Sequence, residues 1–247
     1  MSIAKKLSIG VVALVVLVVG SVIVYVQFIH GDAPPKLDFI ATDSATSGST
    51  DATTTTGTSG STGSATTLAS GAGADGTWKP VTGTQVGYRV KENFIGGLQN
   101  AEAVGRTSSV TGFVNISGTT ATAAEFSADV RTLKSDDDRR DGQVQGRILS
   151  TSQFPAATFT LTSPIDFGHI PTSASDVVTA TATGNLTLRG QTKSVTFEVQ
   201  AILNGTTMQI KGAIPVKFAD YNISNPSNQI VSTADNGTLE FLLVLNR

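Results

Sequence analysis

The chain of 247 residues contains no cysteine, and this absence excludes several kinds of chemistry. There can be no disulfide bond, thiolate metal site, cysteine nucleophile or lipid-modified N-terminal cysteine. Only two histidines are present, His30 and His169. The sequence therefore offers almost no residues from which a Ser-His-Asp triad or a histidine-based zinc site could form. The formal net charge of −2 at pH 7 gives no indication of a nucleic-acid partner. The sequence therefore predicts no metal, no cofactor and no nucleic-acid ligand.

Charge is also missing from one long stretch near the N-terminus. Lys5 and Lys6 precede residues 7–29, an uncharged run dominated by valine, leucine and isoleucine. As a helix, this run would span roughly 35 Å, enough to cross the hydrocarbon core of a bilayer. The first lysine beyond it is Lys36, so the lysine bias orients the N-terminus toward the cytoplasm. We expect residues 1–6 to be cytoplasmic, residues 7–29 to be a single transmembrane helix, and the remainder to lie outside the cell membrane.

A cleaved signal peptide is the competing interpretation of this stretch. Its apolar core should measure about 7–15 residues and should end in a small-x-small cleavage site. The run in this chain is longer, and no good site follows it. We therefore favour an uncleaved membrane anchor.

Large apolar side chains are almost absent from the next segment. Residues 42–75 are nearly all serine, threonine, glycine and alanine with a few aspartates, and Leu68 is the only large apolar residue among them. Such a segment cannot bury enough surface to offset the entropy lost on ordering. The sequence predicts a flexible, disordered linker over residues 30–75 and one folded domain over residues 76–247.

Beyond the linker, the chain shows the period-two alternation that is typical of β-strands. In residues 179–203, apolar and polar side chains alternate on both sides of a turn at Arg189-Gly190-Gln191, which predicts a hairpin. Another strand follows Phe154-Pro155, and Asn204-Gly205 is a strong turn signal. Similar alternation occurs in residues 85–91, 106–116, 122–131, 208–218 and 239–245. About eight short strands result, which indicates a sandwich or a closed antiparallel barrel.

The alternation is lost between residues 135 and 149. Ser135 or one of the aspartates that follow it can cap the start of a helix, and Val144, Ile148 and Leu149 fall at helical spacing. We therefore expect one short helix here.

The inward faces of the predicted strands mix large side chains with small ones. Glycine and alanine occupy several of these positions, among them Gly112, Ala124, Ala182 and Gly184. Small residues can leave room for a lined cavity, or they can relieve crowding at the corners of a barrel. The pattern favours neither interpretation over the other.

Several ordered motifs point to a known family. They are Gly76-x-Trp78, Gly87-Tyr-Arg-Val-x-Glu92, Arg140-Asp141, Phe154-Pro155-x-x-Thr158-Phe159, Gly184-x-Leu186-Thr-Leu-x-Gly190-x-Thr-Lys-x-Val195 and Phe218-x-Asp220-Tyr-x-Ile223. Together they resemble the YceI-like polyisoprenoid-binding family, and in particular its membrane-anchored actinobacterial members, over about residues 76–247. The resemblance implies an all-β fold, a lipocalin-like antiparallel β-barrel of about eight strands with one short helix. It also implies a long isoprenoid ligand in the barrel lumen, such as a polyprenyl quinone or a polyprenyl phosphate.

The candidate ligand-binding residues are the large inward-facing side chains of the predicted strands. They are Tyr88, Val90, Phe94, Phe126, Phe159, Leu161, Leu186, Leu188, Phe197, Val199, Ile214, Val216, Phe241 and Leu243. A plain packed core would show the same alternation, so the pattern does not separate lumen from core.

We therefore expect a membrane-tethered, extracytoplasmic binding protein for an isoprenoid lipid rather than an enzyme. The alternative is a structural or adhesive domain of the cell envelope with a filled core and an exposed apolar patch. An enzyme would have to use a carboxylate pair drawn from Glu92, Glu125 and Asp129, whose spacing nothing in the sequence defines. The oligomeric state, a homodimer included, stays open.

Overall fold

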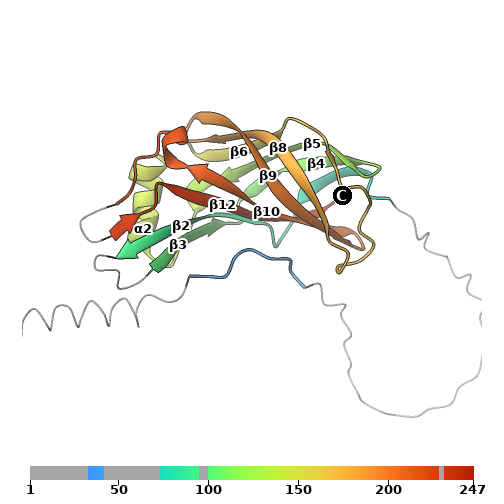
Figure 1. Ribbon diagram of the computed structural model, residues 1–247, viewed down its shortest axis with the longest axis horizontal. Coiled ribbons are helices and arrows are strands. Elements are labelled where there is room, and N and C mark those ends of the chain that lie inside the picture. The colour runs from blue at the N-terminus through green and yellow to red at the C-terminus, as the bar shows by residue number, and fades with distance from the viewer. Residues whose placement is uncertain (1–32, 42–72, 95–99, 228–230) are drawn as a thin grey trace, which may run out of the picture.

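A computed structural model of the chain describes residues 33–41, 73–94, 100–227 and 231–247 (Figure 1). The predicted transmembrane helix over residues 7–29 and most of the predicted linker lie outside these ranges. Within the part of the chain that the structure describes, no helix combines the length and the apolar character needed to cross a membrane.

Eight strands close into an antiparallel ring (Figure 1). The order around the ring is β1 (Gly76–Pro80), β4 (Val110–Ser117), β5 (Thr120–Asp129), β6 (Ala156–Leu161), β8 (Val178–Leu188), β9 (Gln191–Asn204), β10 (Thr207–Lys217) and β12 (Asn236–Asn246). The ring closes because β12 pairs back with β1. Closure removes the unpaired edges that an open sheet would expose. The prediction of an all-β, antiparallel barrel of about eight strands is confirmed.

Three further strands extend the ring at one end. After a break at residues 81–84, β2 (Gln85–Phe94) continues the path of β1 and pairs with β12. β3 (Asn100–Thr107) and β11 (Val231–Thr233) then flank β2. The sequence predicted one continuous strand over residues 106–116, but β3 and β4 are separate because the backbone turns between them, where Val110 donates to the Ser108 carbonyl. A short strand, β7 (Ile165–Asp166), pairs with the start of β5 at the opposite end.

A short helical segment completes the wall at the extended end. After β5, the chain forms the 3₁₀ helix η2 (Val130–Thr132), the α-helix α2 (Asp138–Gln143) and the π-helical turn η3 (Val144–Ile148). The Asp137 carboxylate caps α2 by accepting a hydrogen bond from the Arg139 N–H at 2.8 Å. An early aspartate therefore starts the predicted helix. We call this end of the barrel the α2 end and the opposite end, where β1 and β7 lie, the Trp78 end.

The predicted hairpin is present as β8 and β9. Leu188 pairs with Gln191, so Arg189 and Gly190 form a two-residue turn. Both turn residues have positive φ, 48° and 72°, as a type I′ hairpin turn requires. The second predicted turn lies at Gly205, which also has positive φ.

A segment of the predicted linker lies against the outside of the barrel. Residues 33–41, which we call the strap, run along the outer face of the sheet (Figure 1). Near the start of the strap, the Pro34 carbonyl accepts a hydrogen bond from Arg89 of β2 at 2.8 Å. Near its end, the Ile40 N–H donates to the Gln209 side-chain oxygen at 2.8 Å, and the Ile40 carbonyl accepts from the Gln209 amide at 2.9 Å. This part of the linker is therefore attached to the barrel.

The strap lies over a strand that is buried on both of its faces. Leu243 and Leu245 of β12 point into the barrel, and Leu242 and Val244 on the outer face are buried as well. Burial on both sides is the interpretation that the continuous apolar run of residues 241–245 favours.

An ion cluster ties β12 to β2 and β3 beneath the strap. Glu240 of β12 accepts hydrogen bonds from Arg89 at 3.2 Å and from Arg106 of β3 at 2.8 Å. Arg89 also donates to Glu102 at 2.6 Å. Glu240 and Arg89 are both buried, so each charge depends on its partners to offset the loss of water.

Replacing Glu240→Gln should destabilise the fold by roughly 3 kcal/mol, because two guanidinium groups lose their shared carboxylate. The measurement is urea unfolding of the full chain, followed by circular dichroism. The control is Glu198→Gln, which changes an exposed carboxylate on β9 and should shift the free energy of unfolding by less than about 0.5 kcal/mol. Equal unfolding midpoints for the two variants would contradict a structural role for the cluster.

Candidate ligand-binding cavity

The barrel contains two adjoining cavities that together form its lumen. Cavity 1 has a volume of about 420 Å³ and lies at the α2 end, and cavity 2 has a volume of about 100 Å³ and lies deeper in the barrel. Four residues, Val86, Ala128, Ala157 and Leu239, line both cavities. The side chain of Arg139 belongs to the rim of cavity 1 and is 84% exposed, so this cavity reaches the surface at the α2 end.

Thirteen of the fourteen candidate residues line the lumen. Cavity 1 is lined by Tyr88, Val90, Leu188 and Val216. Cavity 2 is lined by Phe126, Phe159, Leu161, Leu186, Phe197, Val199, Ile214, Phe241 and Leu243. Phe94 ends β2, and its side chain lies outside the described part of the structure. The inward orientation agrees with the alternation, whereas a role in ligand binding stays a prediction for each of these residues.

Two groups of lining residues come from outside the predicted strands. The helical segment contributes Arg140, Gln143, Val144, Ile148 and Leu149. The 3₁₀ helix η4 (Phe218–Tyr221) and the chain after it contribute Phe218, Ile223, Pro226, Val231 and Thr233. The helical spacing of Val144 and Ile148 could have indicated an apolar face, but nothing in the sequence indicates that this face covers a barrel opening.

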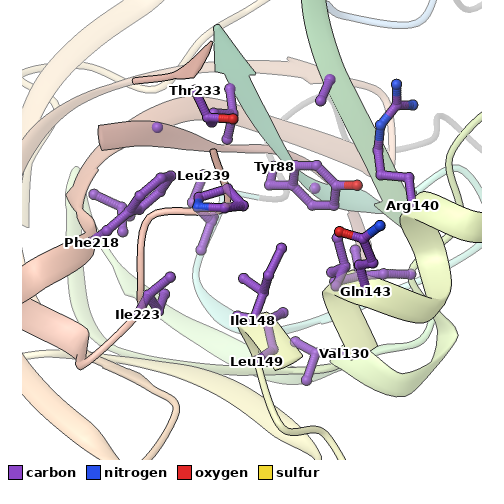
Figure 2. Close-up of a pocket in the computed structure, with 18 of the residues that line it drawn as sticks. Tyr88, Val130, Arg140, Gln143, Ile148, Leu149, Phe218, Ile223, Thr233 and Leu239 are labelled. Carbon is purple, nitrogen blue, oxygen red and sulfur yellow. The ribbon is translucent and has the colours of Figure 1, made fainter. Parts of the chain in front are cut away.

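The polar groups of cavity 1 gather at one side of it. Figure 2 shows the Tyr88 hydroxyl pointing toward Arg140 and Gln143, while Phe218 and Ile223 lie on the other side. The Tyr88 hydroxyl oxygen is buried, and no group among the described residues meets the distance and angle of a hydrogen bond to it, although the Ser135 side chain lies close enough to lower its pKa slightly. Burial raises the pKa of this hydroxyl well above its usual value, so it stays a neutral donor. A buried hydroxyl with no partner is unusual, and it can donate to a ligand atom.

The charges around cavity 1 balance one another. Arg140 forms ion pairs with Asp136 and, at 3.9 Å, with Glu92. The charged residues that line the cavity are two carboxylates and two guanidinium groups, from Glu92, Asp137, Arg139 and Arg140. The lining therefore carries no net charge that would favour a multivalent anion.

Four aromatic rings lie over glycines of neighbouring strands. A Cβ atom on the glycine would come within 2.4–2.9 Å of the ring in the pairs Gly105–Tyr88, Gly112–Phe126, Gly184–Phe159 and Gly212–Phe241. Each ring fills the space that a side chain would need at the glycine position. The ring can therefore lie flat along the barrel wall instead of projecting into the lumen. The glycines thus relieve crowding, whereas alanines such as Ala124 and Ala182 line the cavity itself. Both interpretations of the small residues therefore apply, to different positions.

The structure does not bring the three carboxylates of the enzyme hypothesis together. Glu92 lines cavity 1, whereas Glu125 is exposed on the outside of β5. Asp129 accepts hydrogen bonds from the backbone and side chain of Arg131. Among the described residues, no group of three or more histidines and carboxylates could hold a metal ion.

Gly184→Ala should lower the free energy of unfolding by about 2–3 kcal/mol, because the new methyl group overlaps the Phe159 ring and the Thr160 carbonyl. Thermal and urea unfolding measure the loss. The control is Gly142→Ala in α2, where a Cβ atom would have no neighbour within 4 Å and should stabilise the helix slightly. Adding Phe159→Leu to Gly184→Ala should recover part of the loss, and no recovery would argue against the ring as the cause.

Comparison with known proteins gives a family and a set of related folds. The family model of the YceI-like domain matches residues 80–245, and no curated protein matches the chain. BcnA from Burkholderia cenocepacia is 24% identical, with a TM-score of 0.48 over 64% of this chain and 95% of its own. A polyisoprenoid-binding domain from Saccharophagus degradans, implicated in plant cell wall breakdown, is 16% identical, with a TM-score of 0.54 over 69% of this chain and 97% of its own.

The residues that match the family model include the whole lining of the lumen. Residues 80–245 include every residue that lines the two cavities, and they make up about two thirds of the chain. The chain therefore belongs to the YceI-like family.

Proposed function

We propose that this protein is a membrane-tethered, extracytoplasmic binding protein for a long-chain isoprenoid lipid. The lumen carries this proposal, because an apolar cavity of about 420 Å³ continues into a second one lined by aromatic and aliphatic side chains. Cavity 1 alone falls in the usual volume range of ligand pockets, about 300–1,000 Å³. The polyisoprenoid-binding description of the related S. degradans domain supports the same class of ligand. The tether is the apolar run of residues 7–29.

Burial of the isoprenoid chain supplies the affinity. An apolar chain gains about 25 cal/mol for each Å² removed from water, so several hundred Å² give on the order of 10 kcal/mol before other costs. Immobilising a flexible chain consumes much of this gain. In our proposal the tail extends past Val86 and Leu239 into cavity 2, and the head group stays at the α2 end.

The polar side of cavity 1 favours a neutral head group that accepts hydrogen bonds. The Tyr88 hydroxyl is a buried donor that makes no hydrogen bond of normal length and angle among the described residues, and Arg140 is already paired with two carboxylates. A quinone carbonyl needs one such donor, whereas a phosphate would need unpaired cations to offset its charge. We therefore favour a polyprenyl quinone over a polyprenyl phosphate.

An adhesive envelope domain receives less support. It requires a filled core and a contiguous apolar patch on the surface. The lumen is not filled, and the exposed large hydrophobic residues among the described ones are only Ile40, Val81 and Val177.

The first test is to purify the full chain from a host that makes polyprenyl quinones and to measure its bound lipid by native mass spectrometry and solvent extraction. We expect about one isoprenoid per chain. Ile148→Trp places an indole in cavity 1 and should reduce the bound isoprenoid by roughly tenfold or more. Arg147→Trp, at the exposed neighbouring position, should leave it unchanged. A lipid-free mass that persists when polyprenyl lipids are added would overturn the proposal.

The second test concerns the head group. Tyr88→Phe should weaken quinone binding about tenfold, because one hydrogen bond is lost, and it should leave the lipid-free protein at least as stable. Tyr221→Phe is the matched control, since the Tyr221 hydroxyl is also buried without a hydrogen bond among the described residues but does not line the lumen. Equal affinities of Tyr88→Phe and the unmodified chain, measured by titration with a quinone, would exclude this hydroxyl as the donor.

A further inference from the structure

We propose that the strap holds the α2 end of the barrel, where cavity 1 opens, next to the membrane from which the chain emerges. This inference rests on the proposed membrane tether. It concerns the orientation of the barrel, which neither the family nor the ligand determines.

The direction of the strap follows from its contacts with β2 and β10, which pair with β12 at different positions along that strand. Its first contact is with Arg89, which pairs across the sheet with Thr238, a residue that lines cavity 1. Its last contact is with Gln209, which pairs with Val244 near the Trp78 end. The strap therefore enters at the level of cavity 1 and runs toward the Trp78 end (Figure 1).

The strap binds to a site on the barrel that contains a buried polar side chain. Gln209 is only 2% exposed although it lies on the outer face of β10, and both polar groups of its amide bond the backbone of Ile40. Lys211 forms an ion pair with Asp38 and lies 4.3 Å from the centre of the Phe39 ring. The hydrogen bond from Lys211 also lowers the pKa of Asp38, so this carboxylate stays charged at neutral pH. A polar residue buried in this way points to a persistent partner, because an unpaired amide would be costly.

Docking shortens the tether greatly. If the membrane helix ends at residue 29, only residues 30–33 separate it from Pro34, the first strap residue in contact with the barrel, and four residues reach at most about 14 Å. Without docking, the whole stretch of residues 30–75 would act as a flexible coil with a root-mean-square span of roughly 35–40 Å. The strap thus converts a long tether into a short one at the cavity end. A lipid could then pass between the bilayer and the lumen without crossing bulk water.

The absence of cysteine makes this orientation directly measurable. The full chain is inserted into phosphatidylcholine vesicles that carry an acceptor-labelled lipid, with one donor dye attached at Asp138→Cys or at Val177→Cys. Asp138 is 95% exposed beside the cavity rim at the α2 end, and Val177 is exposed just before β8 at the Trp78 end. We expect energy transfer to the bilayer to be roughly twofold or more higher from position 138 than from position 177.

Releasing the strap should abolish this difference. The triple variant Asp38→Ser, Phe39→Ser, Ile40→Ser removes the strap side chains that contact Lys211 and pack beside Gly83. Lys36→Ser, an exposed position in the same segment, is the control and should keep the difference. Hydrogen exchange on the unmodified chain gives a second readout, in which the Ile40 amide should be protected by Gln209. Equal transfer from both positions, or an unprotected Ile40 amide, would overturn the inference.

The same samples separate this inference from the proposed function. Vesicle flotation reports the tether, and lipid extraction reports the cavity. A chain that floats and carries an isoprenoid but transfers energy equally from both positions contradicts the strap inference alone. A chain that does not float contradicts the tether and, with it, this inference, while the lipid content still tests the cavity.

Discussion

Closure of the sheet at β12 is the constraint on which the rest of the structure depends. This strand pairs with β10 along its length and with β1 and β2 on its other side, so the ring has no open edge there. Its inner residues form one wall of the lumen, while Glu240 on its outer face joins the arginines of β2 and β3. The strap docks on the same side of the sheet, on Arg89 of β2 and Gln209 of β10, the two strands that pair with β12. Lumen, ion cluster and strap therefore all depend on the correct register of one strand.

A closed eight-stranded barrel is narrow, and an open lumen needs a reason. One reason is the packing of rings over glycines, which keeps Phe126, Phe159 and Phe241 close to the wall. Phe197 packs edge-to-face against two of these rings. The distance between ring centroids is 5.4 Å to Phe159 and 5.9 Å to Phe241, and these contacts help to fix the rings. The other reason is the helical segment after β5. Its residues line cavity 1 at the α2 end, in place of a further strand. Both features widen the interior without breaking the ring.

Buried polar groups on the outer face of the barrel differ from those in the lumen in how their hydrogen bonds are satisfied. On the outside, the Glu240 carboxylate accepts hydrogen bonds from Arg89 and Arg106, and both guanidinium groups also donate to strap carbonyls. On the inside, the charges of the rim cancel, and the Tyr88 hydroxyl has no partner among the described residues. An unpaired buried hydroxyl costs stability until a ligand accepts its hydrogen bond. The polar groups on the outer face therefore satisfy one another, whereas the Tyr88 hydroxyl in the lumen is left available to the ligand that we propose.

The sequence by itself determined the features that depend on neighbouring residues. Period-two alternation identified the inward faces, so thirteen of fourteen candidate residues line the lumen, and local turn and cap chemistry located the turn at Arg189-Gly190 and the helix after Asp137. Only the tertiary structure decided which glycines lie under rings, that the helix and the segment after Phe218 line the cavity, and that the strap docks. These features join residues far apart in the chain, as Ile40 and Gln209 are, separated by 169 positions. No local pattern records such a contact, because it forms only once the ring has closed and brought the two surfaces together.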